Sequence, residues 1–73
     1  RIYPNPTENE INITGNPAEL EQLVIFNILG HDVTSLTKQV SSDDSHLVID
    51  LSNLEVGLYF VKTKTTTNKV YKK

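Results

Sequence analysis

The two histidines of this 73-residue chain and its one pair of adjacent aspartates are the first candidates for binding a metal or moving protons. His31 and His46 lie far apart, and the chain has no cysteine, so neither histidine has a partner at the spacing of a zinc site. Asp43 and Asp44 follow one another directly, without the alternating oxygen ligands of an EF-hand calcium loop. We expect all four side chains to be solvated on polar loops, with no metal or cofactor bound.

Other catalytic patterns also fail to match. The serines have no Gly-x-Ser-x-Gly context, and no glycine-rich loop could hold a phosphate. Paired carboxylates would need a cleft, for which a domain of this size has little room. The aromatic residues Tyr59, Phe60 and Tyr71 interleave with lysines, but a net charge of −2 argues against nucleic-acid binding. The sequence therefore predicts a protein that is not an enzyme and acts through another protein.

Charge is unevenly distributed along the chain. No acidic residue follows Val56, and this last part of the chain contains five lysines: Lys62, Lys64, Lys69, Lys72 and Lys73. One interpretation is a solvated edge strand on which lysines discourage pairing with other sheets. The other is a docking segment, in which a partner pairs with the backbone edge and reads the lysines as charge.

Short strands are the elements that must position these residues. Polar and apolar residues alternate in Glu10–Thr14 and in 46–51, as is typical of half-buried strands. The run 23–29 is apolar at all but one position, which predicts a central strand covered on both faces. Gly30 then predicts a hairpin turn with a positive φ angle, and 33–40 is the expected return strand.

The rest of the chain continues this all-β pattern. A surface loop is expected at 41–45, a crossover at 52–57, a strong strand at 58–65, and a short final strand at 69–73 after a turn. No helix is expected, and no apolar run approaches the roughly 20 residues that span a membrane. The sequence predicts one domain over 1–73, a small immunoglobulin-like antiparallel β-sandwich of six or seven short strands. Its abrupt start suggests the end of a longer protein.

One cluster goes beyond a generic sandwich. Leu54, Gly57 and Tyr59 follow one another at the entry to the strand at 58–65. In a Greek-key corner, the leucine closes the end of the sandwich, the glycine allows a tight bend, and the tyrosine hydroxyl returns to the crossover backbone. This is foremost a folding motif, the tyrosine corner.

Four segments in this order resemble a known family. They are 3–6 (Tyr-Pro-Asn-Pro), the apolar run 24–30, the stretch 51–61 with its Gly-Leu-Tyr, and the lysine-rich 69–73. Together they look like the type A C-terminal sorting domain of the type IX (Por) secretion system of Bacteroidetes. Thr63 departs from the pattern, because an apolar residue is usual there, and the end of its strand is therefore expected to be less buried.

The resemblance implies a secretion address. Such a domain is fused behind a cargo protein and is recognised by outer-membrane translocon and sortase components. The cargo passes through the periplasm and reaches the cell surface or the medium, often after a sortase has removed the domain. The residues that the resemblance associates with sorting are Pro4, Asn5, Pro6, Gly30, Gly57, Tyr59, Lys69, Lys72 and Lys73.

An immunoglobulin-like carbohydrate-binding or adhesive module of an extracellular protein is the alternative. Such a module would need exposed aromatic side chains on one face, and the chain has no tryptophan.

Overall fold

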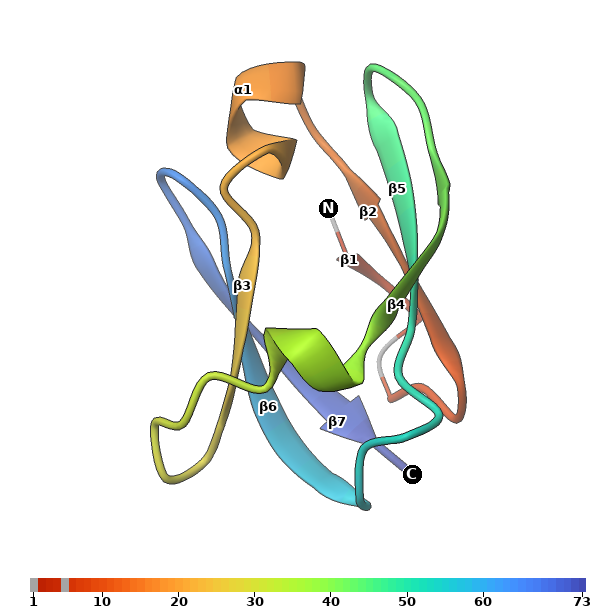
Figure 1. Cartoon of the computed structure of the whole chain (residues 1–73), viewed down its shortest axis with the longest axis vertical. Coiled ribbons are helices and arrows are strands. Elements are labelled where there is room, and N and C mark those ends of the chain that lie inside the picture. The colour runs from red at the N-terminus through yellow and green to blue at the C-terminus, as the bar shows by residue number, and fades with distance from the viewer. Residues whose placement is uncertain (1, 5) are drawn as a thin grey trace.

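Two antiparallel sheets packed face to face make up the molecule (Figure 1), and the computed structural model describes residues 2–4 and 6–73. The described residues form a four-stranded sheet and a three-stranded sheet. The strands are β1 (Ile2–Tyr3), β2 (Glu10–Thr14), β3 (Val24–Asn27), β4 (Lys38–Ser42), β5 (His46–Asp50), β6 (Gly57–Lys62) and β7 (Thr67–Lys72). A single-turn helix, α1 (Pro17–Leu20), and a 3-10 helix, η1 (Thr34–Leu36), lie in the connections.

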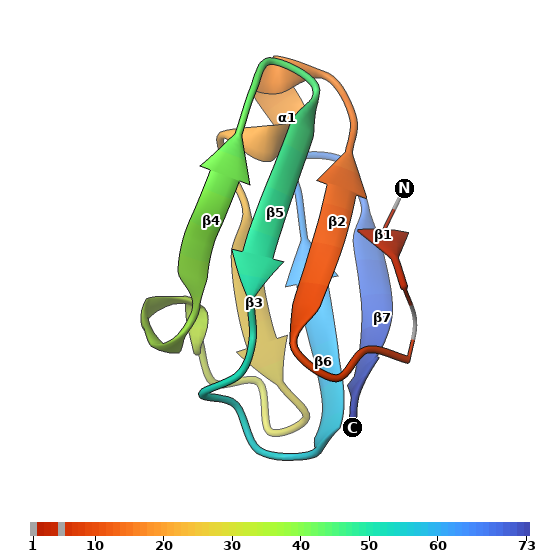
Figure 2. The same ribbon diagram turned by 90° about the vertical axis from the view of Figure 1, so that its right-hand side faces the viewer.

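The strand order confirms the predicted sandwich. It is β1-β2-β5-β4 in one sheet and β3-β6-β7 in the other. In chain order these strands occupy the places of strands A, B, E and D and of strands C, F and G in a constant-type immunoglobulin domain. The connections from β2 to β3, from β3 to β4 and from β5 to β6 each cross between the sheets; Figure 2 shows the four-stranded sheet in front and the three-stranded sheet behind it.

Alternation along the strands builds the core. In β2 and β5 every second residue is buried, and these residues face the buried positions of β3, β6 and β7. The buried hydrophobic residues are Ile11, Ile13, Ile25, Val33, Leu47, Ile49, Leu51, Leu54, Tyr59, Val61 and Val70. The predicted strands at Glu10–Thr14 and 46–51 are thus confirmed, and Gly30 has the predicted positive φ, at 84°.

The prediction of a central, doubly covered strand at 23–29 is wrong. The strand β3 is only four residues long and lies at one edge of its sheet. It ends at Asn27, whose side-chain oxygen accepts hydrogen bonds from the backbone N–H groups of Leu29 and His31, both at 3.0 Å. This local turn competes with the strand ladder and leaves Ile28 and Leu29 68% and 75% exposed.

The predicted return strand at 33–40 is also wrong in its first half. Asp32 accepts a hydrogen bond from the backbone N–H of Thr34 at 2.9 Å, and η1 follows. The Thr34 hydroxyl in turn accepts from the backbone N–H of Ile25 at 2.9 Å, and the Val33 N–H donates to the Ile25 carbonyl at 2.8 Å. These bonds cover part of the outer edge of β3, and the chain then crosses to the other sheet as β4.

The last hairpin turns earlier than predicted. β6 ends at Lys62, because Thr63 is buried and begins the turn. The Thr63 backbone N–H donates to the Thr66 carbonyl at 2.8 Å, and the two threonine hydroxyls are 2.7 Å apart. The expectation of a less buried Thr63 is therefore wrong: hydrogen bonds satisfy its polar atoms inside the turn.

α1 is the other departure from the expected pattern. Pro17 begins this single turn, and the Asn16 side chain caps it by accepting from the backbone N–H of Glu19 at 3.0 Å. Within the described part of the chain, no helix has the length and apolar character needed to cross a bilayer.

Candidate functional site

The corner between β5 and β6 organises the region that the sequence associates with sorting. The Tyr59 ring is only 7% exposed, and its hydroxyl donates to the Glu55 carbonyl at 2.8 Å. Burial, with a smaller contribution from the Glu55 carboxylate, raises the pKa of the Tyr59 hydroxyl above its ordinary value. The hydroxyl therefore stays protonated and keeps donating at neutral pH, and the predicted tyrosine corner is confirmed.

The residues around Tyr59 serve the same corner. Leu54 is buried, and its backbone N–H donates to the carbonyl of the fully buried Leu51 at 2.9 Å. Gly57 has a φ of 156°, and a Cβ atom placed on it would meet nothing within 4 Å. The backbone conformation, rather than a lack of space, therefore requires glycine at this position.

The final strand β7 faces two environments. Val70 and Lys72 point into the sandwich, whereas Lys69 and Tyr71 are exposed. The Lys72 side chain is 7% exposed, and its Nζ donates to the Lys73 carbonyl at 2.8 Å. Lys72 is thus placed as a structural residue, while Lys69 and Lys73 are exposed.

Asp50 connects this strand to the other sheet through charge. The backbone N–H of Ser52 donates to the Asp50 carboxylate at 2.8 Å, and this bond, followed by one from the Ser52 hydroxyl, lowers the pKa of Asp50. Lys38 and Lys72 add smaller contributions in the same direction. The local hydrogen bonds from Ser52 are therefore the main reason for the lowered pKa of Asp50.

Thr7 connects the segment before β2 to the final strand β7 through hydrogen bonds. Its backbone N–H donates to the Tyr71 carbonyl at 2.8 Å, and its carbonyl accepts from the Lys73 N–H at 2.7 Å. The Thr7 hydroxyl donates to the Glu10 carbonyl at 2.6 Å, and the residue is buried. Sequence reasoning missed Thr7, because a lone threonine after a proline carries no signal of burial.

The structure brings most of the predicted sorting residues together. Gly57 pairs with Lys72 in the register of β6 and β7, and Tyr59 pairs with Val70. Pro4 and Pro6 are exposed in the segment before Thr7, which lies beside β7 (Figure 2). Three predicted residues lie elsewhere or are placed otherwise: Gly30 is in the turn after β3, Lys72 is buried, and Asn5 lies outside the described residues.

The histidines and aspartates occupy unrelated positions. His31 is exposed in the turn after β3, and Asp43 and Asp44 are exposed between β4 and β5, as expected. His46 is only partly exposed, because its Nε2 lies 2.9 Å from the side-chain oxygen of Asn12 on the neighbouring strand. Among the described residues, no three His, Cys, Asp or Glu side chains are grouped to hold a metal ion.

Comparison with known proteins gives two matches. The family described as "Secretion system C-terminal sorting domain" matches residues 1–73. The protein named ulvan lyase NLR42, from Nonlabens ulvanivorans, is 32% identical over 71 residues, which cover 96% of this chain but only 12% of that relative. No solved structure matches.

Proposed function

Because the chain belongs to the family of secretion-system C-terminal sorting domains, we propose that type IX secretion machinery recognises it as the address of an attached cargo protein. The family match along all 73 residues is the observation that carries this proposal. The family is one of sorting signals and not of enzymes. The sandwich supports the role, because it has a hydrophobic core of its own and can fold as a separate unit behind a cargo.

The proposed route has three stages. The cargo, fused ahead of this domain, first enters the periplasm. The domain then binds outer-membrane translocon components, and the cargo crosses to the cell surface or the medium. A cell-surface sortase then removes the domain from the cargo.

Two groups of residues divide the work in this proposal. Gly57 and Tyr59 fix the shape of the corner between β5 and β6, since Gly57 bends the backbone and the Tyr59 hydroxyl donates to the Glu55 carbonyl. Lys69 and Lys73 are exposed and offer positive charge to the machinery. The Lys72 ammonium donates to the Lys73 carbonyl, so in this proposal Lys72 contributes to the structure of β7 and does not contact the machinery.

The match to ulvan lyase NLR42 fits this division of a longer protein into cargo and address. This chain corresponds to 12% of the length of that relative, so we propose no lyase activity for it.

A reporter fusion tests the proposal. A fluorescent protein with an N-terminal signal peptide is fused ahead of the 73-residue chain and expressed in a bacterium that has a type IX system. We expect the reporter at the cell surface or in the medium, and in the periplasm when the chain is omitted or the type IX translocon is deleted. A reporter that stays in the periplasm with the chain attached would contradict the proposal.

A further inference from the structure

The outer face of the three-stranded sheet is unusually apolar. Tyr59 and Val61 of β6 point into the core. The residues that alternate with them, Leu58, Phe60 and Lys62, therefore point outward. The same alternation applies to β3 and β7. We call the resulting surface the outer β3–β6–β7 face, and its residues are Val24, Phe26, Leu58, Phe60, Lys62, Thr67, Lys69 and Tyr71.

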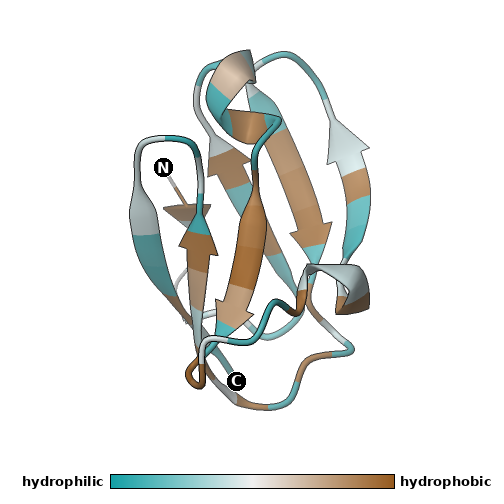
Figure 3. Ribbon diagram, turned by 60° about the vertical axis from the view of Figure 1, so that its left-hand side comes forward, coloured by the Kyte–Doolittle hydropathy of each residue, from teal (hydrophilic) through white to brown (hydrophobic). Residues whose placement is uncertain are grey.

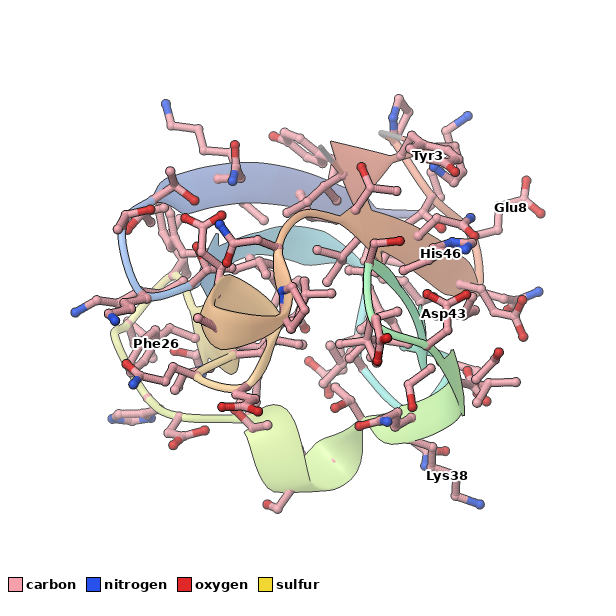
Figure 4. The ribbon with its side chains drawn as sticks, turned by 90° about the horizontal axis from the view of Figure 1, so that it is seen from above. Tyr3, Glu8, Phe26, Lys38, Asp43 and His46 are labelled. Carbon is pink, nitrogen blue, oxygen red and sulfur yellow. The ribbon has the colours of Figure 1, made fainter. Side chains whose placement is uncertain are left out.

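The strand register sets these side chains in rows. Phe60 lies between Phe26 on one side and Lys69 on the other, and Leu58 is paired with Tyr71. Aromatic and aliphatic side chains in such cross-strand rows contact one another, which explains why those of β3 and β6 are partly buried. Figure 4 shows Phe26 on the side of the molecule away from His46 and Asp43.

The sandwich covers this face only in part: Val24, Phe26, Leu58 and Phe60 are half-buried. Of the described residues, those of α1 and η1 lie beside it and not over it, as Figure 3 shows. Tyr71 is 57% exposed. An antiparallel sheet with one face in the core normally has polar side chains on the other, and an apolar surface rimmed by polar groups marks an interaction site. The outward-facing Val24 and Phe26 of β3, together with the exposed Tyr71, therefore mark this face as a surface that a partner could cover.

Charge and shape indicate the chemistry of that partner. β3, β6 and β7 contain no acidic residue, and Lys62 and Lys69 are exposed among the apolar side chains. A hollow of about 490 Å³ lies at one end of the face. It is lined by Glu21, Gln22, Leu23, Val24, Phe26, Lys62, Thr63 and Lys64, so apolar side chains form part of its wall, and its two lysines outnumber its one glutamate.

We propose that the outer β3–β6–β7 face is the docking surface for an acidic protein partner that places an apolar side chain in this hollow. Aromatic residues surrounded by complementary charge are typical of the centre of protein interfaces. A sugar would need several hydrogen-bonding side chains, and besides its lysines this face offers Thr67 and the phenol of Tyr71. The partner belongs to the export machinery, so the inference rests on the proposed sorting function.

Matched substitutions on the two sheets test the surface. Tyr71 on β7 and Val40 on β4 are similarly exposed, at 57% and 55%, and both lie on edge strands. Lys69 and Lys38 form a second pair of exposed residues, one on each of these strands. In the reporter assay, we expect Tyr71→Thr and Lys69→Glu each to lower the exported fraction about tenfold, as loss of one interface anchor does, and Val40→Thr and Lys38→Glu to leave it unchanged.

The outcomes separate the two proposals. Export by the unsubstituted chain together with equal export by all four folded variants would overturn the docking surface and leave the sorting function standing. Failure of the unsubstituted chain would contradict the function itself. Thermal melting of each variant checks folding, and Lys69→Glu, which changes an exposed side chain, keeps the test valid if Tyr71→Thr unfolds.

A binding experiment identifies the partner chemistry. The ¹⁵N-labelled 73-residue chain is titrated with a random glutamate–tyrosine copolymer and, separately, with a sulfated polysaccharide. Salt-sensitive shifts at Phe60, Lys69 and Tyr71 with the copolymer would support an acidic protein partner. Shifts at these residues with the polysaccharide alone would overturn the proposal in favour of a glycan site. Concentration-dependent shifts without any additive would overturn it in favour of self-association, and the absence of any shift with the copolymer would also count against it.

Discussion

The outer faces of the two sheets differ in the type of side chain at their outward-facing positions. On the four-stranded sheet, Glu10 lies opposite Asp50, which lies opposite Lys38 on the far strand. His46 and Asn12 are joined through their side chains at 2.9 Å. That face carries the polar side chains that an exposed sheet usually presents.

The outer β3–β6–β7 face replaces those polar groups with Phe26, Phe60 and Tyr71 and keeps lysines as its charges. Both sheets contribute equally well to the same core, so the inner alternation alone is enough to fold the chain. The comparison therefore separates the residues that make the sandwich from those that a partner would need. Substitutions on one outer face at a time test this separation.

The largest effect is expected from a substitution that unfolds the whole domain and so disrupts the outer faces of both sheets. Tyr59→Ala should lower the free energy of unfolding by about 3–5 kcal/mol, because it truncates a buried aromatic ring and removes the bond to Glu55. A domain of this size has little stability to spare, so we expect it to unfold. Urea denaturation measures the change, and Tyr59→Phe, which keeps the ring, should cost only about 1 kcal/mol. A melting temperature for Tyr59→Ala close to that of the unsubstituted chain would refute the corner.

A backbone substitution should have the next largest effect. Gly57→Ala should cost about 1–3 kcal/mol, because a φ of 156° is unfavourable for a residue with a Cβ atom. Gly15→Ala is the matched control: no such φ occurs there, and the new Cβ would make only ordinary contacts with Glu19 and Leu20 at 3.5 and 3.8 Å. Equal denaturation midpoints for the two variants would show that Gly57 is not strained.

Extremes of pH should act on the two sheets through different groups. The pKa of Asp50 is lowered in the folded chain, so its stabilising contribution is present above its ordinary pKa of 3.8 and is lost as the pH falls through the folded value. The pKa of Tyr59 is raised from 10.0, so its contribution is present below that pH and is lost as the pH rises through the folded value.

Melting temperatures measured across pH check this prediction. We expect a plateau at neutral pH, an acid decrease that Asp50→Ala reduces, and an alkaline decrease that Tyr59→Phe reduces. The two substitutions should act on separate limbs of the profile. An alkaline limb that is unchanged in Tyr59→Phe would mean that the phenol does not control stability at high pH.

The smallest stability effects are expected for exposed lysines. Lys38→Gln and Lys69→Gln should each change the free energy of unfolding by less than about 0.5 kcal/mol, since charges on exposed side chains contribute little to stability. Export should nevertheless decrease for Lys69→Gln and not for Lys38→Gln. Deleting 69–73 would be a less informative experiment, because it also removes the fully buried Val70. Equal export by both glutamine variants would remove the functional distinction between the faces.

Sequence reasoning was most reliable where one face of a strand is buried and the other is polar. β2 and β5 alternate cleanly, and their positions were predicted to within a residue. β4 could not be delimited in this way, because all five of its residues are exposed and a register shift between Gln39 and Ser41 interrupts its pairing with β5. The tyrosine corner was predictable because its leucine, glycine and tyrosine lie close together in the sequence.

The sequence-based predictions were wrong at residues whose burial differs from what is usual for their type. Val24 and Phe26 point out of the sandwich, so the apolar run of β3 was read as a covered central strand. Thr7, Thr63 and Lys72 are polar yet buried, and each depends on hydrogen bonds to groups that pattern analysis cannot place. The resemblance supplied the predicted sorting residues, whereas their clustering on β6 and β7 and the contrast between the outer faces required the strand register.

The bridge at Thr7 also determines how the domain would respond to mechanical force. Thr7 and Lys72 are paired in parallel: the Thr7 N–H donates to the Tyr71 carbonyl, and the Thr7 carbonyl accepts from the Lys73 N–H. When tension is applied between the two ends of the chain, parallel segments are pulled along each other and not peeled apart. Both bonds are then loaded in shear and must break together. When a cargo pulls on the domain, these two bonds would therefore have to break before the sandwich could unfold.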